Sequence, residues 1–192
     1  MPPRIVLAST SPYRRALLER LALPFEVLRP EVDETPAAGE DPAALVARLA
    51  AAKAKAAATH FADGLAIGSD QVATFDGRIL GKPGAHDAAV AQLRALSGRT
   101  VEFLTGVCVV DLARGAARAD LAVTRVRFRT LTNASIEAYL AREPAYDCAG
   151  SFKSEGLGIT LVDAVDDDDP TALVGLPLIR LCRLLRGFGV EV

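Results

Sequence analysis

Several short clusters of polar residues in this chain have the types and spacing of a chemical site, and the first is typical of anion binding. Residues 9–15 read Ser-Thr-Ser-Pro-Tyr-Arg-Arg and directly follow an apolar stretch. Ser11 is predicted to cap a helix, whose free backbone N–H groups and positive dipole end attract anions. Arg14 and Arg15 oppose that dipole, which favours a bound phosphate. A plain capped helix is the alternative.

Two groups of carboxylates suggest a cation or a general base. Asp33 and Glu34 lie in a turn-like segment, and such oxygen ligands suit Mg²⁺ or Mn²⁺, although this segment taken alone favours a solvated loop. Asp70 interrupts an apolar segment between Ser69 and Val72. A carboxylate there is costly unless it binds a cation or a proton. A turn or capping role for Asp70 is the other interpretation.

Lysine is rare in this chain, which has 18 arginines and four lysines. Lys53 shares a helix face with Val46 and Leu49, so it lies at the edge of an apolar stripe and either extends its ammonium to solvent or pairs with an anion. Lys55 is predicted to face water. Lys82 lies in a Gly-Lys-Pro turn.

A glycine-rich segment and an acidic run complete the polar clusters. Residues 148–158 (CAGSFKSEGLG) combine three glycines with Lys153 and Glu155, which indicates either close backbone approach to a ligand or a flexible loop. The acidic residues at 163 and 166–169 are predicted to form a solvated turn rather than a metal cluster.

The elements that position these residues are helices and strands, which alternate early in the chain. A long hairpin follows in the middle of the chain. A mixed α/β sheet is therefore predicted, rather than a regular Rossmann alternation. Helices are expected at residues 12–21, 42–61, 87–96, 133–140 and 177–186. Strands are expected at residues 5–8, 25–28, 65–67, 71–75, 78–80, 101–112, 121–128 and 158–162.

Composition excludes several classes of protein. The chain has 192 residues, 51% of them hydrophobic, and a net charge of −2, which favours a globular protein and disfavours a general nucleic-acid-binding surface. Three cysteines without a CxxC pattern predict neither a disulfide framework nor a zinc site. No apolar run approaches the ~20 residues of a membrane span. We expect a soluble cytoplasmic protein.

The polar clusters together resemble a known family. Residues 7–15, 31–36, 68–72, 81–83 and 174–177 match, in that order, motifs of the Maf family of nucleoside triphosphate pyrophosphatases. Residues 148–156 resemble the branch of that family that hydrolyses 7-methyl-GTP. The sister branch, which acts on dTTP and UTP, has Gln at the position of Glu155 and Arg at the position of Tyr13.

The resemblance implies a single Maf-like domain over residues 1–192. Its fold would be an elongated mixed α/β sheet, similar to that of Maf and ITPase proteins, in two lobes with a central cleft. The implied reaction converts a nucleoside triphosphate to the monophosphate and pyrophosphate with a divalent cation, Mg²⁺ or Mn²⁺. Asp70 would accept the proton, and Glu34 and Asp70 would bind the metal. Phosphates would be held by Ser9, Arg14, Lys53 and Lys82. Base preference would be set by Tyr13, Gln71 and Glu155.

Other functions stay open at this point. The same reaction on dTTP, UTP or another modified nucleotide is one, and a nucleotide-binding regulator of septum formation is another. A protein that only binds nucleotide has no need of a carboxylate such as Asp70 beside the phosphates, so catalysis is favoured. The expected partner is a small-molecule nucleotide, without a stable nucleic acid or a membrane, and the resemblance also allows a homodimer.

Overall fold

The computed structural model describes residues 3–192, and over these residues it has seven strands in one mixed sheet and five α-helices. The strand order is β2-β1-β3-β5-β6-β7, and β4 pairs with β3. β1 is parallel to β2 and β3, whereas the β3–β4 and β6–β7 pairs are antiparallel. The mixed α/β class is therefore confirmed.

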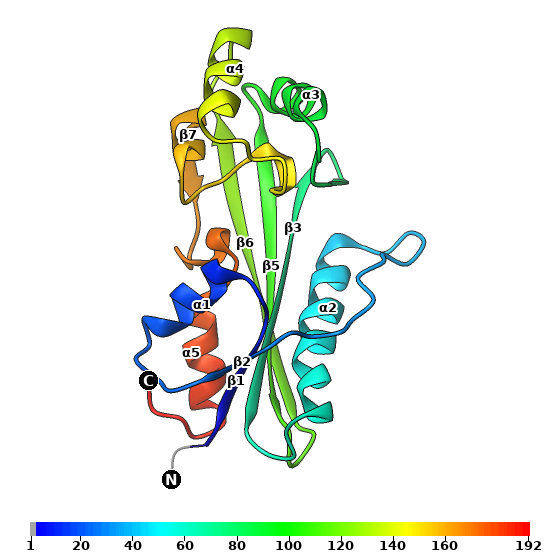
Figure 1. Ribbon diagram of the computed structural model, residues 1–192, viewed down its shortest axis with the longest axis vertical. Coiled ribbons are helices and arrows are strands. Elements are labelled where there is room, and N and C mark those ends of the chain that lie inside the picture. The colour runs from blue at the N-terminus through cyan, green and yellow to red at the C-terminus, as the bar shows by residue number, and fades with distance from the viewer. Residues whose placement is uncertain (1–2) are drawn as a thin grey trace. The chain divides into compact units, whose positions relative to one another are not determined.

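The elements follow the chain as Figure 1 labels them. The strands are β1 (Ile5–Ala8), β2 (Glu26–Leu28), β3 (Leu65–Phe75), β4 (Arg78–Leu80), β5 (Thr100–Asp111), β6 (Ala117–Phe128) and β7 (Val162–Asp166). The α-helices are α1 (Pro12–Glu19), α2 (Pro42–Ala56), α3 (His86–Leu96), α4 (Asn133–Arg142) and α5 (Leu178–Arg186). Short 3₁₀ turns are η1 (Ala57–Thr59), η2 (Ala149–Ser151), η3 (Leu157–Leu161) and η4 (Ala172–Val174).

The chain forms two compact units, in agreement with the two lobes that the family resemblance implies. The first unit contains the residues up to Gln71 together with Leu104–Ala122 and Asp169–Val192. The second contains Val72–Phe103 and Val123–Asp168. The division falls within β3, β5 and β6.

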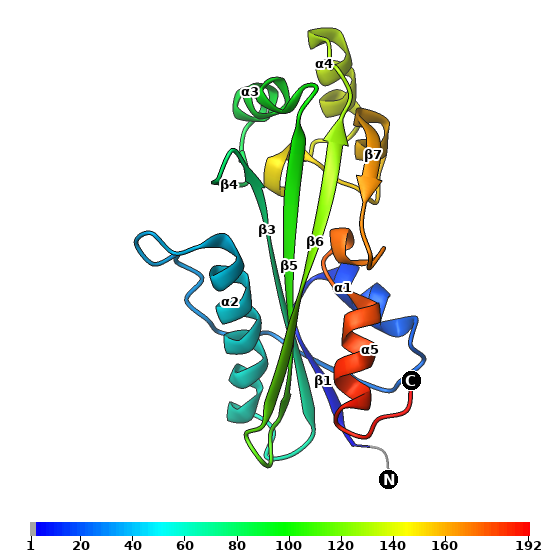
Figure 2. The same cartoon turned by 180° about the vertical axis from the view of Figure 1, so that it is seen from behind.

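The first unit is a sheet covered by helices on both faces. Alternate residues of β1 point to opposite sides, so that Leu7 packs with α1 and α5 and Val6 packs with α2. Figures 1 and 2 show α1 and α5 together on one face of these strands and α2 on the other. β1 and the part of β3 that pairs with it are buried on both sides for this reason, which explains their continuous apolar sequence, whereas β2 lies at the sheet edge and is largely exposed.

Two glycines let α2 lie unusually close to the sheet. A Cβ atom at Gly68 in β3 would overlap the backbone of Ala50 and Ala54 in α2, and one at Gly106 in β5 would overlap Val46. Only glycine fits at such approaches. Lys53 lies on the same buried face of the helix as Ala50 and Ala54, so this close packing brings its side chain against β3.

The second unit packs α3, α4 and η2 around a small aromatic core. Phe152, which follows η2, lies 5.8 Å from Phe103 in β5 and 5.3 Å from Phe128 in β6, measured between ring centroids. These contacts hold the glycine-rich segment that begins at Cys148 against its own part of the sheet.

Two strand predictions differ from the structure. The two strands expected at residues 65–67 and 71–75 are one continuous strand, β3, which carries Asp70 in its interior. The strand expected at 158–162 is wrong, because residues 157–161 form η3 and the strand begins at Val162. The Gly158 amide donates to the carbonyl of Lys153 at 3.1 Å, and this local turn removes it from any strand ladder.

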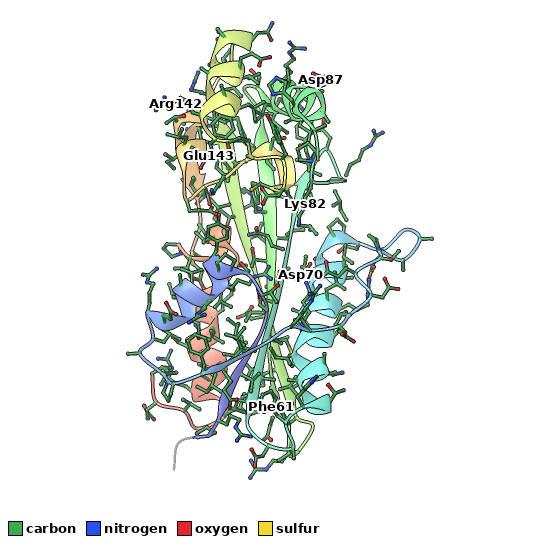
Figure 3. All side chains as sticks on the ribbon, viewed as in Figure 1. Phe61, Asp70, Lys82, Asp87, Arg142 and Glu143 are labelled. Atoms are coloured by element: carbon green, nitrogen blue, oxygen red, sulfur yellow. The ribbon has the colours of Figure 1, made fainter. Side chains whose placement is uncertain are left out.

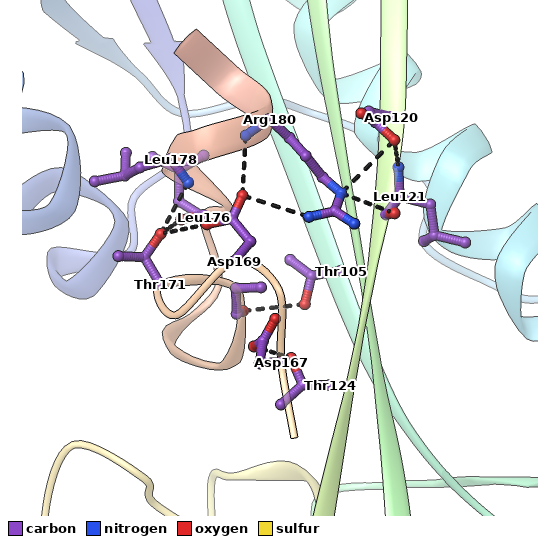
Figure 4. A network of polar contacts seen from close by, with 11 residues as sticks. Thr105, Asp120, Leu121, Thr124, Asp167, Asp169, Thr171, Leu176, Leu178 and Arg180 are labelled. Atoms are coloured by element: carbon purple, nitrogen blue, oxygen red, sulfur yellow. Dashed lines mark hydrogen bonds and ion pairs between the residues drawn. The ribbon is translucent and has the colours of Figure 1, made fainter. Parts of the chain in front are cut away.

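The prediction of a solvated acidic turn is also wrong in part. Asp169 is fully buried and accepts hydrogen bonds from the backbone amide of Arg180 at 2.9 Å and from the Thr171 hydroxyl at 3.2 Å. The Thr171 hydroxyl in turn accepts from the amide of Leu178 at 2.8 Å (Figure 4). Both amides belong to the first turn of α5, where backbone donors lack helical partners and a negative charge is favoured. Asp169 therefore caps α5.

Over residues 3–192, no helix combines the length and the apolar content that crossing a bilayer requires.

Candidate active site

The segment between β1 and α1 presents hydroxyl and basic groups at a helix N-terminus. Ser11 caps α1 as predicted, with its hydroxyl accepting from the Arg14 amide at 3.3 Å. Ser9 is 5% exposed, and its Oγ accepts from the Ser11 amide at 3.2 Å. Tyr13 is exposed on the first turn of α1. The local pattern of Ser and Pro residues produces this geometry without help from the rest of the fold.

Arg14 is fixed from a distant part of the chain. Its Nε donates to the carbonyl of Gly175 at 2.8 Å, and the Ser69 hydroxyl lies 2.9 Å from the same oxygen. Gly175 has a φ of 119°, and a Cβ atom there would lie 3.3 Å from the Arg14 Nε. A backbone carbonyl within the motif at residues 174–177 thus orients the arginine. The sequence did not predict this role, because every residue has a backbone carbonyl and residue type does not show which one makes a contact.

Lys53 lies between two carboxylates. Its Nζ is 2.6 Å from Asp70 Oδ1 and 2.6 Å from Glu34 Oε1. The Lys53 side chain is 8% exposed and that of Asp70 10%, whereas that of Glu34 is 61% exposed. The structure therefore decides between the two interpretations of Lys53 in favour of ion pairing. Lys55 is exposed, as predicted.

The loop that carries Glu34 is attached to α2. Asp33 Oδ1 accepts from the Thr35 amide at 2.9 Å, so Asp33 shapes the turn. Arg48 of α2 donates to the Thr35 carbonyl at 3.2 Å and to both oxygens of the Glu40 carboxylate, at 2.7 and 2.8 Å. The hydrogen bond from Arg48 lowers the pKa of Glu40 to about 2. Arg48 and Glu40 were not expected from the sequence to serve the site.

The cluster balances two cations against two carboxylates. Burial lowers the pKa of the Arg14 guanidinium, and the negative charges of Asp70 and Glu34 act in the opposite direction. Desolvated charges of this kind are stable only when they are paired. A polyanionic ligand would disturb that balance unless further positive charge accompanied it.

The carboxylates of Glu34 and Asp70 could hold a divalent cation that is also bound by the phosphates of a substrate. Among residues 3–192, no group of three or more His, Cys, Asp or Glu residues is close enough to hold a metal ion. Glu34 and Asp70 each use one oxygen on Lys53, which leaves each a second oxygen. Mg²⁺ is commonly bound by one or two carboxylates together with water and substrate phosphates, so the donor chemistry fits.

Gln71 fixes the short turn η4. Its Nε2 lies 2.8 Å from Thr105 Oγ1, 2.9 Å from the Ala172 carbonyl and 3.1 Å from the Leu173 carbonyl. These contacts join β3 and β5 to the segment that leads into Gly175. Gln71 therefore has a structural role that the sequence did not suggest, alongside the expected one in base preference.

The second unit carries the two remaining predicted residues on exposed segments. Lys82 lies between β4 and α3, and Glu155 follows Phe152 and Lys153; both are exposed. Asp70, on β3, and Lys82 are labelled in Figure 3. The Ser154 hydroxyl donates to Glu155 Oε2 at 3.0 Å.

Gln92 of α3 connects these two segments within the second unit. Its Nε2 donates to the Gly81 carbonyl at 2.9 Å, and its Oε1 accepts from the Ser151 hydroxyl at 2.7 Å. Ser151 is buried and has a φ of 57°, a conformation that non-glycine residues rarely adopt. Gln92 was missed, although it is half-buried and its spacing from the buried Ala89 and Leu96 places it on their side of the helix, where a polar group needs partners.

Comparison with known proteins decides the family. The model of the family described as Maf-like protein matches residues 4–188. The chain belongs to the Maf family. Curated Maf relatives named 7-methyl-GTP pyrophosphatase include one from Burkholderia pseudomallei (strain 1710b), which is 60% identical over 98% of this chain and 89% of its own length. Another, from Albidiferax ferrireducens, is 57% identical over 98% of this chain and 95% of its own.

A third Maf relative of the same name, from Polaromonas sp. (strain JS666), is 60% identical over 98% of this chain and 86% of its own. Among solved structures, a HAM1 protein from Coxiella burnetii has a TM-score of 0.46 and 22% identity, covering 67% of this chain and 73% of that one.

Proposed function

We propose that this Maf protein hydrolyses 7-methyl-GTP to 7-methyl-GMP and pyrophosphate, and so removes a modified nucleotide. The observation that carries the proposal is the buried pair of Asp70 and Lys53, which Glu34 joins in the unit that also holds Ser9 and Arg14. This unit supplies both a carboxylate that can act as a general base, Asp70, and cations that can bind phosphates, Lys53 and Arg14. The relatives named 7-methyl-GTP pyrophosphatase, 60% identical to this chain, support the choice of base.

The phosphates of the substrate would meet the basic residues. Gly175 holds Arg14 through its Nε, and the Nη groups of the guanidinium would bind a phosphate. Ser9, Lys53 and Lys82 would provide further donors. Stabilising the charge that develops on the leaving pyrophosphate is the largest electrostatic task in this reaction. A divalent cation bound by Glu34 and Asp70 would supply additional positive charge at the phosphates.

Asp70 would act as the general base. A water molecule attacks the α-phosphorus, and its proton passes to the Asp70 carboxylate. The new bond joins the water oxygen to the α-phosphorus, and the bond from that phosphorus to the oxygen bridging it to the β-phosphorus breaks. Pyrophosphate leaves with the electron pair. Lys53, at 2.6 Å from Oδ1, orients the carboxylate for this transfer.

Base preference would depend on Tyr13, Gln71 and Glu155. Methylation at N7 gives guanine a delocalised positive charge, and an aromatic ring can stack on such a cation. A carboxylate such as Glu155 can accept hydrogen bonds from the N1–H and N2–H₂ groups of guanine. Both exposed side chains have the chemistry required, and the negative charge of Glu155 also attracts the cationic base.

We further propose a cytoplasmic location and, on the family resemblance, a homodimer. The free thiols of Cys108, Cys148 and Cys182 suit a reducing compartment. Light scattering on purified protein measures the oligomeric state: a mass of twice 20.2 kDa is expected, and a monomer would contradict the dimer.

Pyrophosphate release tests the proposed function. We expect the wild type with Mg²⁺ or Mn²⁺ to prefer 7-methyl-GTP over GTP, dTTP and UTP, and Asp70→Asn to lose roughly 10²–10⁴-fold in kcat, the range for a general base. Asp63→Asn, which changes an exposed carboxylate of the same unit, serves as the matched control and should retain activity. No release from any triphosphate would refute the enzyme, and a preference for dTTP or UTP would refute the base assignment.

A further inference from the structure

A tight turn at Lys153–Gly158 places Glu155 at its tip. The Lys153 carbonyl accepts from the Gly156 amide at 3.2 Å and from the Gly158 amide at 3.1 Å. The Lys153 amide donates to the hydroxyl of Tyr139, in α4, at 3.3 Å. The backbone of the turn is thus closed on itself and attached to α4 at its beginning.

Glu143, which ends α4, attaches the far side of the same turn. It is the C-cap residue of α4, directly after Arg142, with an extended backbone and with its amide bonded to the Tyr139 carbonyl. The Glu143 carboxylate accepts a short hydrogen bond from the Leu157 amide through Oε2, and its Oε1 lies 3.4 Å from Lys153 Nζ. The side chain is 17% exposed, and Figure 3 labels it at the end of α4.

The packing of Glu143 against the turn requires glycine at position 156. A Cβ atom at Gly156 would overlap all three atoms of the Glu143 carboxyl group. The φ of Gly156 is −125°, which other residues also adopt, so the requirement comes from the carboxylate and not from the backbone angle. Residues 143 and 156 therefore form one contact, which can be broken from either side.

The charge of Glu143 has a second consequence for Glu155. Lys153 precedes Glu155 by two residues, and an ammonium group so near would compete for the oxygens of the Glu155 carboxylate. Glu143 draws that ammonium toward α4. Glu155 is exposed, and its Oε2 accepts a hydrogen bond from the Ser154 hydroxyl.

We propose that Glu143 is a positioning residue for base recognition: it fixes the turn and holds Lys153 so that Glu155 can accept hydrogen bonds from a cationic purine base. This inference rests on the proposed function and assigns a role in selecting its substrate. Glu143 itself touches no reacting atom.

The test is the selectivity of Glu143→Gln. Glutamine keeps the size but has one acceptor oxygen for the two donors that Glu143 satisfies. We expect kcat/KM for 7-methyl-GTP relative to UTP to fall roughly tenfold, the effect of one charged hydrogen bond, and mainly through KM. Activity on UTP should stay within about twofold of wild type, since the groups that act on the phosphates are untouched.

The matched control is Glu137→Gln, the same change on the same helix. Glu137 is exposed and pairs with His86 at 2.9 Å, away from the turn. It should leave the selectivity ratio unchanged.

Gly156→Ala is the second test variant. Its methyl group would displace the Glu143 carboxylate, which is the flexible end of a side chain. This variant should reproduce the loss of selectivity with the glutamate still present.

Three outcomes overturn the inference. One is an unchanged selectivity ratio in both Glu143→Gln and Gly156→Ala, and another is an equal loss on all triphosphates, which would indicate a merely structural role. The third is unaltered hydrogen exchange of the Leu157 amide in Glu143→Ala, which removes both acceptor oxygens and tests the anchor without any substrate. A wild-type protein that releases no pyrophosphate from 7-methyl-GTP instead refutes the proposed function, and the exchange measurement still reports on the anchor.

Discussion

The two units hold their functional groups in different ways. In the first unit, Lys53 and Asp70 lie on a helix and a strand of the core, buried and paired at 2.6 Å. In the second, Glu155 lies on an exposed turn that a few contacts from α4 hold in place. The groups proposed to carry the chemistry thus lie on regular elements, whereas the group proposed to recognise the base lies on a loop.

The two units should therefore respond differently to mutation. Changes to the first unit's cluster should lower the rate on every substrate and cost stability, because the charges there depend on each other. Changes to the turn of the second unit should redistribute activity among substrates.

Lys53→Met should have the largest effect on both rate and stability. It leaves Glu34 and Asp70 as two carboxylates without the ammonium between them, one of them buried. We expect a loss of about 3 kcal/mol in the free energy of unfolding, measured in urea, from breaking a buried ion pair. Activity on all triphosphates should fall by roughly 10²-fold or more. Lys55→Met, on the exposed side of the same helix, is the control, and equal effects of the two variants would contradict the pairing.

Gly175→Ala should have an intermediate effect, through Arg14. The new methyl group would sit 3.3 Å from Arg14 Nε, in addition to the strain of a φ of 119°. Backbone strain of this kind costs about 1–3 kcal/mol in the free energy of unfolding. Gly189→Ala separates the two causes, because Gly189 has a φ of 81° and nothing within 4 Å of its Cβ position. Both variants should lose stability in urea, but only Gly175→Ala should lose kcat/KM on every triphosphate.

Exchange of the base-recognition residues should have the smallest effect on overall rate. Tyr13→Arg would repel a cationic base, and Glu155→Gln would remove a negative acceptor. The double variant should shift kcat/KM from 7-methyl-GTP toward dTTP or UTP by roughly tenfold or more, with the free energy of unfolding almost unchanged since both side chains are exposed. An unchanged order of substrates would show that base preference lies elsewhere.

Local features of the fold could be predicted because their causes are local. The cap at Ser11 follows from residue type, and the structure has it. The outward direction of Lys55 follows from helical spacing alone. The expected strand at 158–162 failed because amides of that segment bond within their own turn, at Lys153, a choice that residue propensity does not reveal.

The sequence by itself determined which residue types stand at which spacings: the hydroxyls and arginines that open a helix, the lysine on an apolar stripe, the carboxylate inside a strand and the family that these motifs identify. Tertiary structure alone decided what those residues touch. Lys53 pairs with Asp70 because two glycines let α2 approach the sheet, and Arg14 is fixed by a carbonyl 161 residues away. Glu143 reaches Leu157 because a turn closes beneath α4. Such contacts depend on how distant segments pack. Each interaction energy arises between two groups that are far apart in the sequence, so neither segment alone reveals it.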